Sequence, residues 1–231
     1  GYDPTFAYEM AVIFRDGLKR MHEKKENIFY YITAMNENYS HPEMPAGVEQ
    51  GIIKGIYRLI ENNFKSANRV QLMGSGTILR EVEAAVALLN DDWSVAADVW
   101  SITSANELRR DGLACQRWNM LHPGETPKVP YITEQLKDTE GPFIAATDYM
   151  KLYTDQLRPY VPGRFNVLGT DGFGRSDTRA KLRHFFEVNR YFIVISALSA
   201  LVDEEKLDPS VIKQALKKYG ISPDKIDPTT V

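Results

Sequence analysis

Apolar residues recur at three- and four-residue spacing over the first two dozen positions, which predicts an amphipathic helix. They are Phe6, Met10, Ile13, Phe14, Leu18 and Met21. Asp3 followed by Pro4 marks its expected start, because an Asp carboxylate can accept backbone N–H bonds and a proline in the first turn sacrifices none. The β-rich, almost continuously apolar run 27–35 then predicts a strand covered on both faces.

From residue 66 onward the pattern alternates regularly between short β-rich runs and longer amphipathic ones. The predicted strands are 69–73, 94–103, 143–147 and 165–169, and the predicted helices are 78–89, 106–119, 151–160, 178–188, 191–207 and 208–219. Gly220 stands where a helix end favours a left-handed residue. This alternation predicts an α/β protein, a three-layer Rossmann-like domain whose mostly parallel sheet has helices on both faces.

A polar stretch rich in Pro and Gly separates the two patterns, so the expected division is 1–40, a linker at 41–65 and a domain at 66–231. The helix and strand before the linker are too few to form a domain. They could add an edge to the following sheet, or be the last α-β unit of a domain whose remainder is absent. We favour the second interpretation, because an unpaired hydrophobic strand edge is a liability that whole proteins avoid.

Charge and composition exclude several classes of protein. The 28 Lys and Arg residues against 31 Asp and Glu residues leave a net charge of -3, with no basic excess for binding nucleic acid or an anionic membrane. The longest apolar run, 191–202, is shorter than a membrane span and contains Ser196 and Ser199. The single Cys115 fits a reducing compartment, so we expect a cytoplasmic protein.

Gly74-Ser75-Gly76 follows a predicted strand and opens a helix, with Asp98 about 20 residues later, as in dinucleotide-binding turns. The third glycine position of that fingerprint falls on Leu79, where close helix–strand packing needs a small residue. We therefore favour a structural turn over a nucleotide site.

A second glycine-rich turn contains Gly172, Gly174, Arg175 and Ser176. It could hold an anion beside the following helix, but it lacks the Lys-Ser/Thr pair of a P-loop, and a packing role is favoured. Ser176 or Asp177 is the expected N-cap of that helix.

Residue types suited to catalysis are sparse, and we assign no catalytic, cofactor-binding or metal residue. The four histidines, which form no metal-ligand motif, are His22, His41, His122 and His184. Cys115 is expected to be a buried, inert thiol. Asn36, Glu37 and Asn38 follow the carboxyl end of the first predicted strand, where α/β sheets place binding groups. They are the best candidates for the neighbourhood of an active-site mouth.

Several strings resemble one enzyme family, the homodimeric bacterial pyruvate dehydrogenase E1 component. They are YDPTFAYE at 2–9, YYIT at 30–33, NENY at 36–39, RWNMLHP at 117–123, TDYMKL at 147–152, LGTDGFGRSD at 168–177 and LRHFFEV at 182–188. The resemblance covers essentially the whole chain in the family's order, and the glycine-rich string with its continuation is far longer than a chance turn motif.

The resemblance implies a transketolase-like C-terminal domain preceded by the end of the middle, pyrimidine-binding domain. It implies a parent enzyme that uses thiamine diphosphate and Mg²⁺ to decarboxylate pyruvate, forms a homodimer and acetylates the lipoyl group of the E2 acetyltransferase. The family's cofactor-binding and catalytic residues would lie before Gly1, so we expect no cofactor in this chain, no activity alone, and a role in architecture and dimer contacts. The alternatives are a transketolase or another 2-oxo acid dehydrogenase E1, a non-catalytic assembly domain, and a small nucleotide-binding module.

Overall fold

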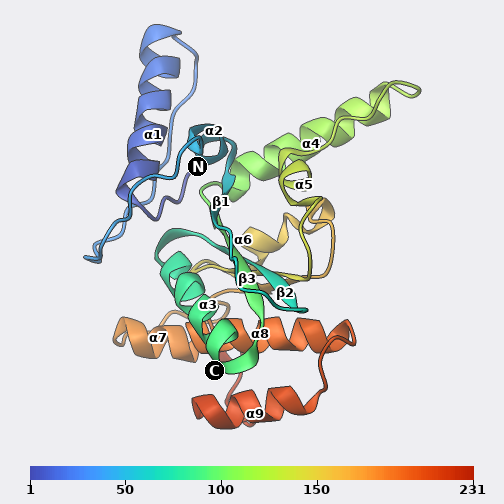
Figure 1. Ribbon diagram of the computed structural model, residues 1–231. Helices are drawn as coiled ribbons and strands as arrows, with labels where there is room; N and C mark the ends of the chain where they lie inside the picture. The colour runs from blue at the N-terminus through green and yellow to red at the C-terminus, as the bar shows by residue number, and fades with distance from the viewer.

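The computed structural model describes residues 1–231 and is built on one five-stranded sheet (Figure 1). The strands are β1 (Ile56–Ile60), β2 (Arg69–Gly74), β3 (Ala96–Ile102), β4 (Phe143–Ala146) and β5 (Phe165–Leu168). Their order is β1-β3-β2-β4-β5, with β1 antiparallel to β3 and all other neighbours parallel. Gly74 pairs with both Ser101 and Ala146, so β2, β3 and β4 end together.

Helices cover both faces of the sheet. The longer ones are α1 (Ala7–Leu18), α3 (Leu79–Trp93), α4 (Ala105–Leu121), α8 (Arg190–Asp203) and α9 (Ser210–Tyr219). The shorter ones are η1 (Lys19–Glu23), α2 (Glu49–Lys54), η2 (Gly76–Ile78), α5 (Tyr131–Leu136), α6 (Lys151–Asp155), η3 (Arg158–Tyr160), α7 (Arg179–Phe185) and η4 (Pro228–Thr230). One buried core joins the sheet to α3 and α8, and another joins its other face to α4 and α5. The predicted three-layer α/β architecture is confirmed.

The stretch 41–65, expected to be a linker, contributes α2 and the edge strand β1. Gly55, between them, has φ of +107°, and a Cβ there would lie 2.4 Å from the carbonyl oxygen of Ser104. Glycine is therefore needed at this junction, because both the left-handed backbone and the close approach exclude a side chain. Strand β1 was missed in the sequence because its short apolar run lies within a polar, Pro- and Gly-rich stretch.

The N-terminal expectations need two corrections. The first helix begins at Ala7 rather than at Asp3 and Pro4, because the Asp3 side chain accepts hydrogen bonds from tyrosines instead of capping a helix. The run 27–35 is not a covered strand: its one β-bridge joins Ile32 to Tyr2, and Phe29 is 85% exposed. No further strand lies beside it to complete a sheet. Accordingly, α1 and this run stand away from the body in Figure 1.

One segment, Arg179–Asp203, has the length and apolarity of a membrane span, with a mean hydropathy of 1.5. The structure divides it into α7 and α8, and α8 packs against α3, β4 and β5. Its apolar side chains Ile193, Val194 and Leu198 are fully buried in the core. This is the apolarity expected of a core helix.

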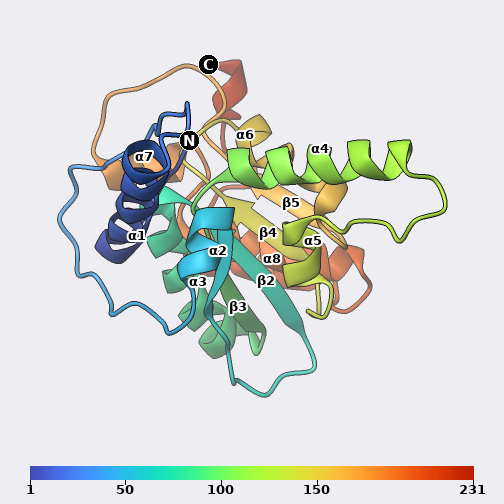
Figure 2. The same cartoon turned by 90° about the horizontal axis from the view of Figure 1, so that it is seen from above.

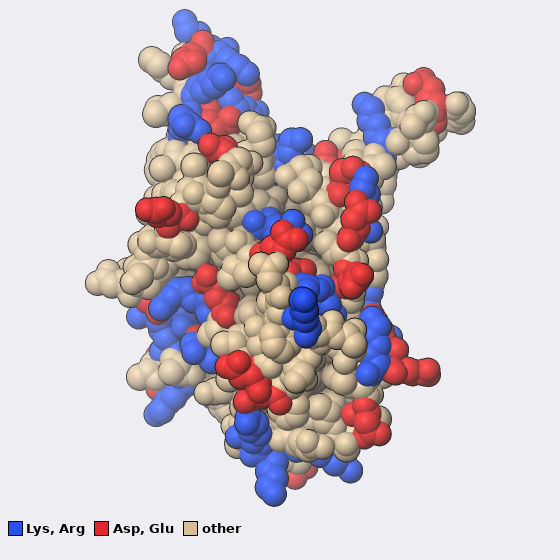
Figure 3. All heavy atoms as spheres, in the orientation of Figure 1, with Lys and Arg blue, Asp and Glu red and all other residues tan.

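Charged side chains of both signs are interspersed over the face shown in Figure 3. Helix α4 extends beyond the edge of the body in Figures 1 and 2. Its exposed Leu113, Met120 and Leu121 lie in the half of the helix that leads to that end.

Candidate functional site

The carboxyl end of the sheet, where binding groups were expected, is crossed by the chain's own N-terminal segment. The backbone N–H of Gly76 donates to the carbonyl of Asp3 at 3.3 Å, and the Thr5 hydroxyl donates to the carbonyl of Gly76 at 2.7 Å. The N–H of Asp3 donates to the carbonyl of Thr103, just after β3, at 2.7 Å. Both backbone polar groups of Gly76, in the turn after β2, are therefore already hydrogen-bonded to residues 3–5.

The same turn shows why the sequence carries only part of a nucleotide-binding fingerprint. A Cβ on Gly74 would lie 2.8 Å from the Cα of Leu79, so Gly74 itself permits the close approach of strand and helix. Asp98 lies opposite Gln71, away from the carboxyl end of β3. Its carboxylate accepts hydrogen bonds from Arg69 at 2.7 Å and from Gln71 at 2.9 Å. These contacts support a structural turn.

Two buried carboxylates fasten the N-terminal segment to the sheet. Asp3 accepts hydrogen bonds from the hydroxyls of Thr33, Tyr149 and Tyr153 at 2.8, 2.9 and 2.5 Å. Glu9 is completely buried in α1, and burial raises the pKa of its carboxyl group. Asp3 thus ties the N-terminal segment to Tyr149, after β4, and to Tyr153, in α6, while Glu9 ties α1 to β1 and β3.

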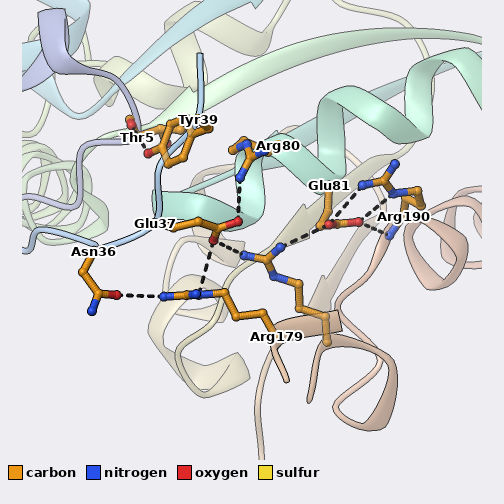
Figure 4. Close-up of polar contacts among 9 residues, drawn as sticks. Thr5, Asn36, Glu37, Tyr39, Arg80, Glu81, Arg179 and Arg190 are labelled. Atoms are coloured by element: carbon orange, nitrogen blue, oxygen red, sulfur yellow. Dashed lines mark hydrogen bonds and ion pairs between the residues drawn. The ribbon is translucent and has the colours of Figure 1, made fainter. Parts of the chain in front are cut away.

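Glu37, one of the predicted site residues, lies in a cluster of arginines (Figure 4). Its carboxylate oxygens lie 2.7 Å from Arg80, 2.8 Å from Arg183 and 3.5 Å from Arg179. Arg183 also lies 3.3 Å from Glu81, whose other oxygen is 2.8 Å from Arg190. We call Glu37, Glu81 and these four arginines the arginine–glutamate network.

Opposing effects act on the two carboxylates of this network. Burial alone would raise the pKa of Glu37 and of Glu81, but the neighbouring guanidinium groups outweigh it, so both pKa values lie below the ordinary glutamate value. Both side chains are therefore held in the ionised form.

Asn36 and Asn38, on either side of Glu37, differ in their side-chain hydrogen bonds. The side-chain carbonyl of Asn36 accepts a 2.7 Å hydrogen bond from Arg179, which brings it to the same cluster. Asn38 makes no side-chain hydrogen bond. Of the three predicted residues, Asn36 and Glu37 thus meet at the carboxyl end of the sheet with arginines from α3 and α7.

The second glycine-rich turn packs against the C-terminal segment. Gly172 has φ of +104°, and a Cβ there would lie 2.3 Å from the carbonyl oxygen of Pro228. Gly174 has open space around it, and Ser176 makes no side-chain hydrogen bond. The expected helix cap is wrong: the N-cap of α7 is Thr178, and the Asp177 carboxylate accepts only from the N–H of Thr178. Arg175 lies over the Phe185 ring, 4.5 Å from its centroid.

A cleft of about 290 Å³ lies between this turn, α7 and the end of β4. Its charged lining residues are Asp148, Arg175, Arg179 and Arg183. Of these, only Arg175 was predicted from the sequence. The four-residue spacing of Arg179 and Arg183 could have indicated that pair, since it places them on one face of α7. No local signal pointed to Asp148.

The other candidate side chains serve the fold. His41 accepts a hydrogen bond from the N–H of Ala7 at 3.1 Å, and the ring of His122 stacks on Trp118 at 4.3 Å. No group of three or more His, Cys, Asp or Glu side chains could hold a metal ion. The residues of this chain thus do not fit a diphosphate–metal site, because the metal donors are missing and the glycine turn is engaged by Asp3 and Thr5.

Comparison with known proteins places this architecture in a family. The model of the transketolase-like C-terminal domain matches residues 55–189, and that of the pyruvate dehydrogenase E1 component middle domain matches residues 1–42. The chain therefore belongs to the transketolase-like C-terminal domain family. Among whole proteins it is similar to the pyruvate dehydrogenase E1 component of Pseudomonas aeruginosa, with 59% identity over 228 residues, and to that of Escherichia coli K12, with 54% identity over 229 residues.

Each alignment covers 98% of this chain and 26% of the relative, so the chain spans about a quarter of the relatives' length. A transketolase structure from Pichia stipitis has a TM-score of 0.58, with 13% identity, over 90% of this chain and 26% of the transketolase. At that identity the likeness shows the fold alone.

Proposed function

We propose that this chain is the C-terminal part of a pyruvate dehydrogenase E1 component. The whole enzyme would decarboxylate pyruvate with thiamine diphosphate and Mg²⁺ and pass the two-carbon unit to the lipoyl group of E2. The observation that carries this proposal is the 59% identity to the Pseudomonas aeruginosa enzyme over 98% of this chain. Identity to the Pichia stipitis transketolase is 13%, which favours an E1 over a transketolase.

Within that enzyme the chain would serve architecture and dimer contacts and would be inactive alone. The lack of a metal-donor cluster supports this role, since the cofactor would then be held by the part of the enzyme beyond this chain. Thiamine diphosphate would supply the electron sink for decarboxylation. Residues of this chain would position neighbouring segments through the Asp3, Glu9 and Glu37 contacts.

We further propose that residues 1–40 complete a middle domain, that 41–65 connect it to 66–231, and that the enzyme is a cytoplasmic homodimer. The support for the first part is the number of large apolar side chains that the N-terminal segment exposes: Phe14, Leu18, Phe29, Tyr31 and Met35. Large exposed apolar surface often marks a face that another protein segment covers.

The first test is an assay of the purified chain with pyruvate, thiamine diphosphate, Mg²⁺ and an electron acceptor. We expect no turnover, and measurable decarboxylation would contradict the proposed role.

A chimera gives the positive test. The corresponding quarter of the Escherichia coli enzyme, 54% identical, would be replaced by this chain. We expect a dimeric enzyme with pyruvate dehydrogenase activity, whereas the matching segment of a transketolase should not restore it. A chimera that is dimeric by light scattering but inactive would count against the proposal.

A further inference from the structure

The cleft beside Arg175 is a feature that the proposed function leaves unused. It opens at the carboxyl ends of β4 and β5, and its lining comes from the segments around Met35, Ile78, Asp148, Gly172 and Arg183. These lining residues all belong to this chain, so binding to the cleft can be tested separately from the reaction proposed above. Open α/β sheets place ligands at this end.

Positive charge exceeds negative charge around the cleft. Three arginines and one aspartate line it. Two of these arginines, Arg179 and Arg183, also belong to the arginine–glutamate network. The cleft and the network together hold five arginines against three carboxylates. The excess leaves the cleft attractive to an anion.

Arg175 is the most available of these cations. It makes no ion pair and no side-chain hydrogen bond. Its guanidinium makes a cation–π contact with the Phe185 ring, 4.5 Å from the centroid. Since no side-chain acceptor is bonded to it, the Arg175 guanidinium has its N–H groups free to bind a phosphate or carboxylate with two parallel hydrogen bonds. Arg179, four residues on, is 52% exposed, which leaves part of its donor set open to solvent.

The remaining polar groups of the cleft can take a hydroxyl. The Asp148 carboxylate accepts no hydrogen bond from another side chain, and burial raises its pKa. The hydroxyls of Thr77 and Thr170 lie in the same lining, although that of Thr170 already donates to the carbonyl of Asp148.

We propose that this cleft binds a small hydroxylated organic anion. Its phosphate or carboxylate group would lie at Arg175 and Arg179, and its hydroxyl at Asp148. A volume of about 290 Å³ corresponds to about ten water molecules at their liquid density, which suits a compact metabolite.

The experiment is calorimetric titration of the 231-residue chain with four probes: inorganic phosphate, glycerol 2-phosphate, tartrate and neutral glycerol. We expect saturable binding of one glycerol 2-phosphate or one tartrate per chain, and none of glycerol. Comparing the affinities of glycerol 2-phosphate and tartrate decides whether the site prefers a phosphate or a carboxylate group. No saturable heat with any of the three anions at millimolar concentration overturns the proposal.

Three variants locate the site. Arg175→Met should weaken anion binding by about tenfold or more, because a charged hydrogen-bonding partner is lost, while Arg175→Lys should retain part of the affinity. Asp148→Asn should weaken glycerol 2-phosphate relative to inorganic phosphate. Arg164→Met, at an exposed ion pair with Asp203, is the matched control and should bind like the wild type.

Arg175 is exposed and unpaired, so its variants should keep the wild-type melting temperature. Undiminished binding by Arg175→Met would mean that the anion binds elsewhere, which would also overturn the proposal.

Discussion

The hydroxyl of Ser101, on β3, donates a 2.6 Å hydrogen bond to the carboxylate of Glu9, on α1. Three other donors meet that carboxylate: the hydroxyl of Tyr57 at 2.7 Å and the backbone N–H groups of Thr5 and Phe6 at 2.5 and 2.9 Å. One buried side chain therefore joins α1, β1, β3 and the segment that crosses the sheet.

Glu9→Ala should destabilise the chain by about 3 kcal/mol or more, because it leaves several buried donors without an acceptor. Glu9→Gln retains one acceptor oxygen and should cost less. The measurement is the free energy of unfolding from urea denaturation. Glu23→Ala, at an exposed and unpaired position, is the control and should stay within about 0.5 kcal/mol of the wild type. Equal stability of Glu9→Ala and Glu23→Ala would contradict the anchoring role.

Asp3→Ala should release the N-terminal segment while the sheet stays folded, because it removes the acceptor for Thr33, Tyr149 and Tyr153. Amide hydrogen exchange should then become faster in residues 1–6 and 28–33 and remain unchanged in β2, β3 and β4. Asp91→Ala, an exposed aspartate without a partner, should change neither region. If amide exchange in residues 1–6 and 28–33 of Asp3→Ala were as slow as in the wild type, other contacts would be holding the segment.

Arg183→Met should destabilise the chain by about 2–3 kcal/mol at neutral pH, because Arg183 is 14% exposed and pairs with both Glu37 and Glu81. Arg164→Met, whose ion pair with Asp203 has side chains 41% and 49% exposed, should cost about 0–1 kcal/mol. Urea denaturation of the two variants measures the contrast. Similar losses would mean that the network is no stronger than a surface pair.

The arginine–glutamate network should also make the free energy of unfolding fall as the pH is lowered into the acid range. The pKa values of Glu37 and Glu81 are lowered in the folded state, so the stability they contribute is complete above the ordinary glutamate pKa. It is lost as the pH falls through the lowered values. Between about pH 6 and about pH 3 the unfolding free energy of Arg183→Met should therefore fall less steeply than that of the wild type. Parallel pH profiles would contradict this linkage.

Gly141→Ala should be far more damaging than Gly124→Ala. Both glycines have positive φ, +87° and +92°, but a Cβ on Gly141 would lie 1.8 Å from the carbonyl oxygen of Arg69, whereas nothing lies within 4 Å of one on Gly124. Gly124→Ala should cost about 1–2 kcal/mol for the left-handed backbone alone, and the excess in Gly141→Ala measures the steric clash. Thermal unfolding of the pair checks this, and equal melting temperatures would contradict it.

The spacing of apolar residues predicted those helices and strands that bury one continuous apolar face. Strands β2, β3, β4 and β5 and helices α3, α4 and α6 carry that pattern in a single stretch of sequence, whereas the six-residue helix α5 was not predicted. Strand β1 does not carry it, because an edge strand with an exposed Arg58 has a weaker apolar signature and lies after a glycine break. Residues 27–35 gave the opposite error: they are apolar, but Phe29 is 85% and Tyr31 is 68% exposed, and no strand of the sheet lies beside them.

The candidate site was predictable only in part. Glu37 was selected because it follows the expected strand 27–35, which the structure does not form. No local pattern could show that Arg80 and Arg183, 43 and 146 residues away in the sequence, would meet it. Asp3 likewise had a plausible local role as a helix cap. Its tyrosine partners are 146 and 150 residues away, and only the folded chain brings them together.

Those long separations set an order of events in folding. Residues 2–6 dock on the carboxyl ends of β2 and β3 and on the loop after β4, so they have no complete docking surface until these strands have paired. During synthesis residues 2–6 are made well over a hundred residues before Tyr149 and Tyr153. Contacts so distant in sequence form slowly. Until Tyr149 and Tyr153 are in place, Asp3 has no acceptor role to fill outside its own segment, so residues 2–6 should be among the last parts of this chain to reach their native position.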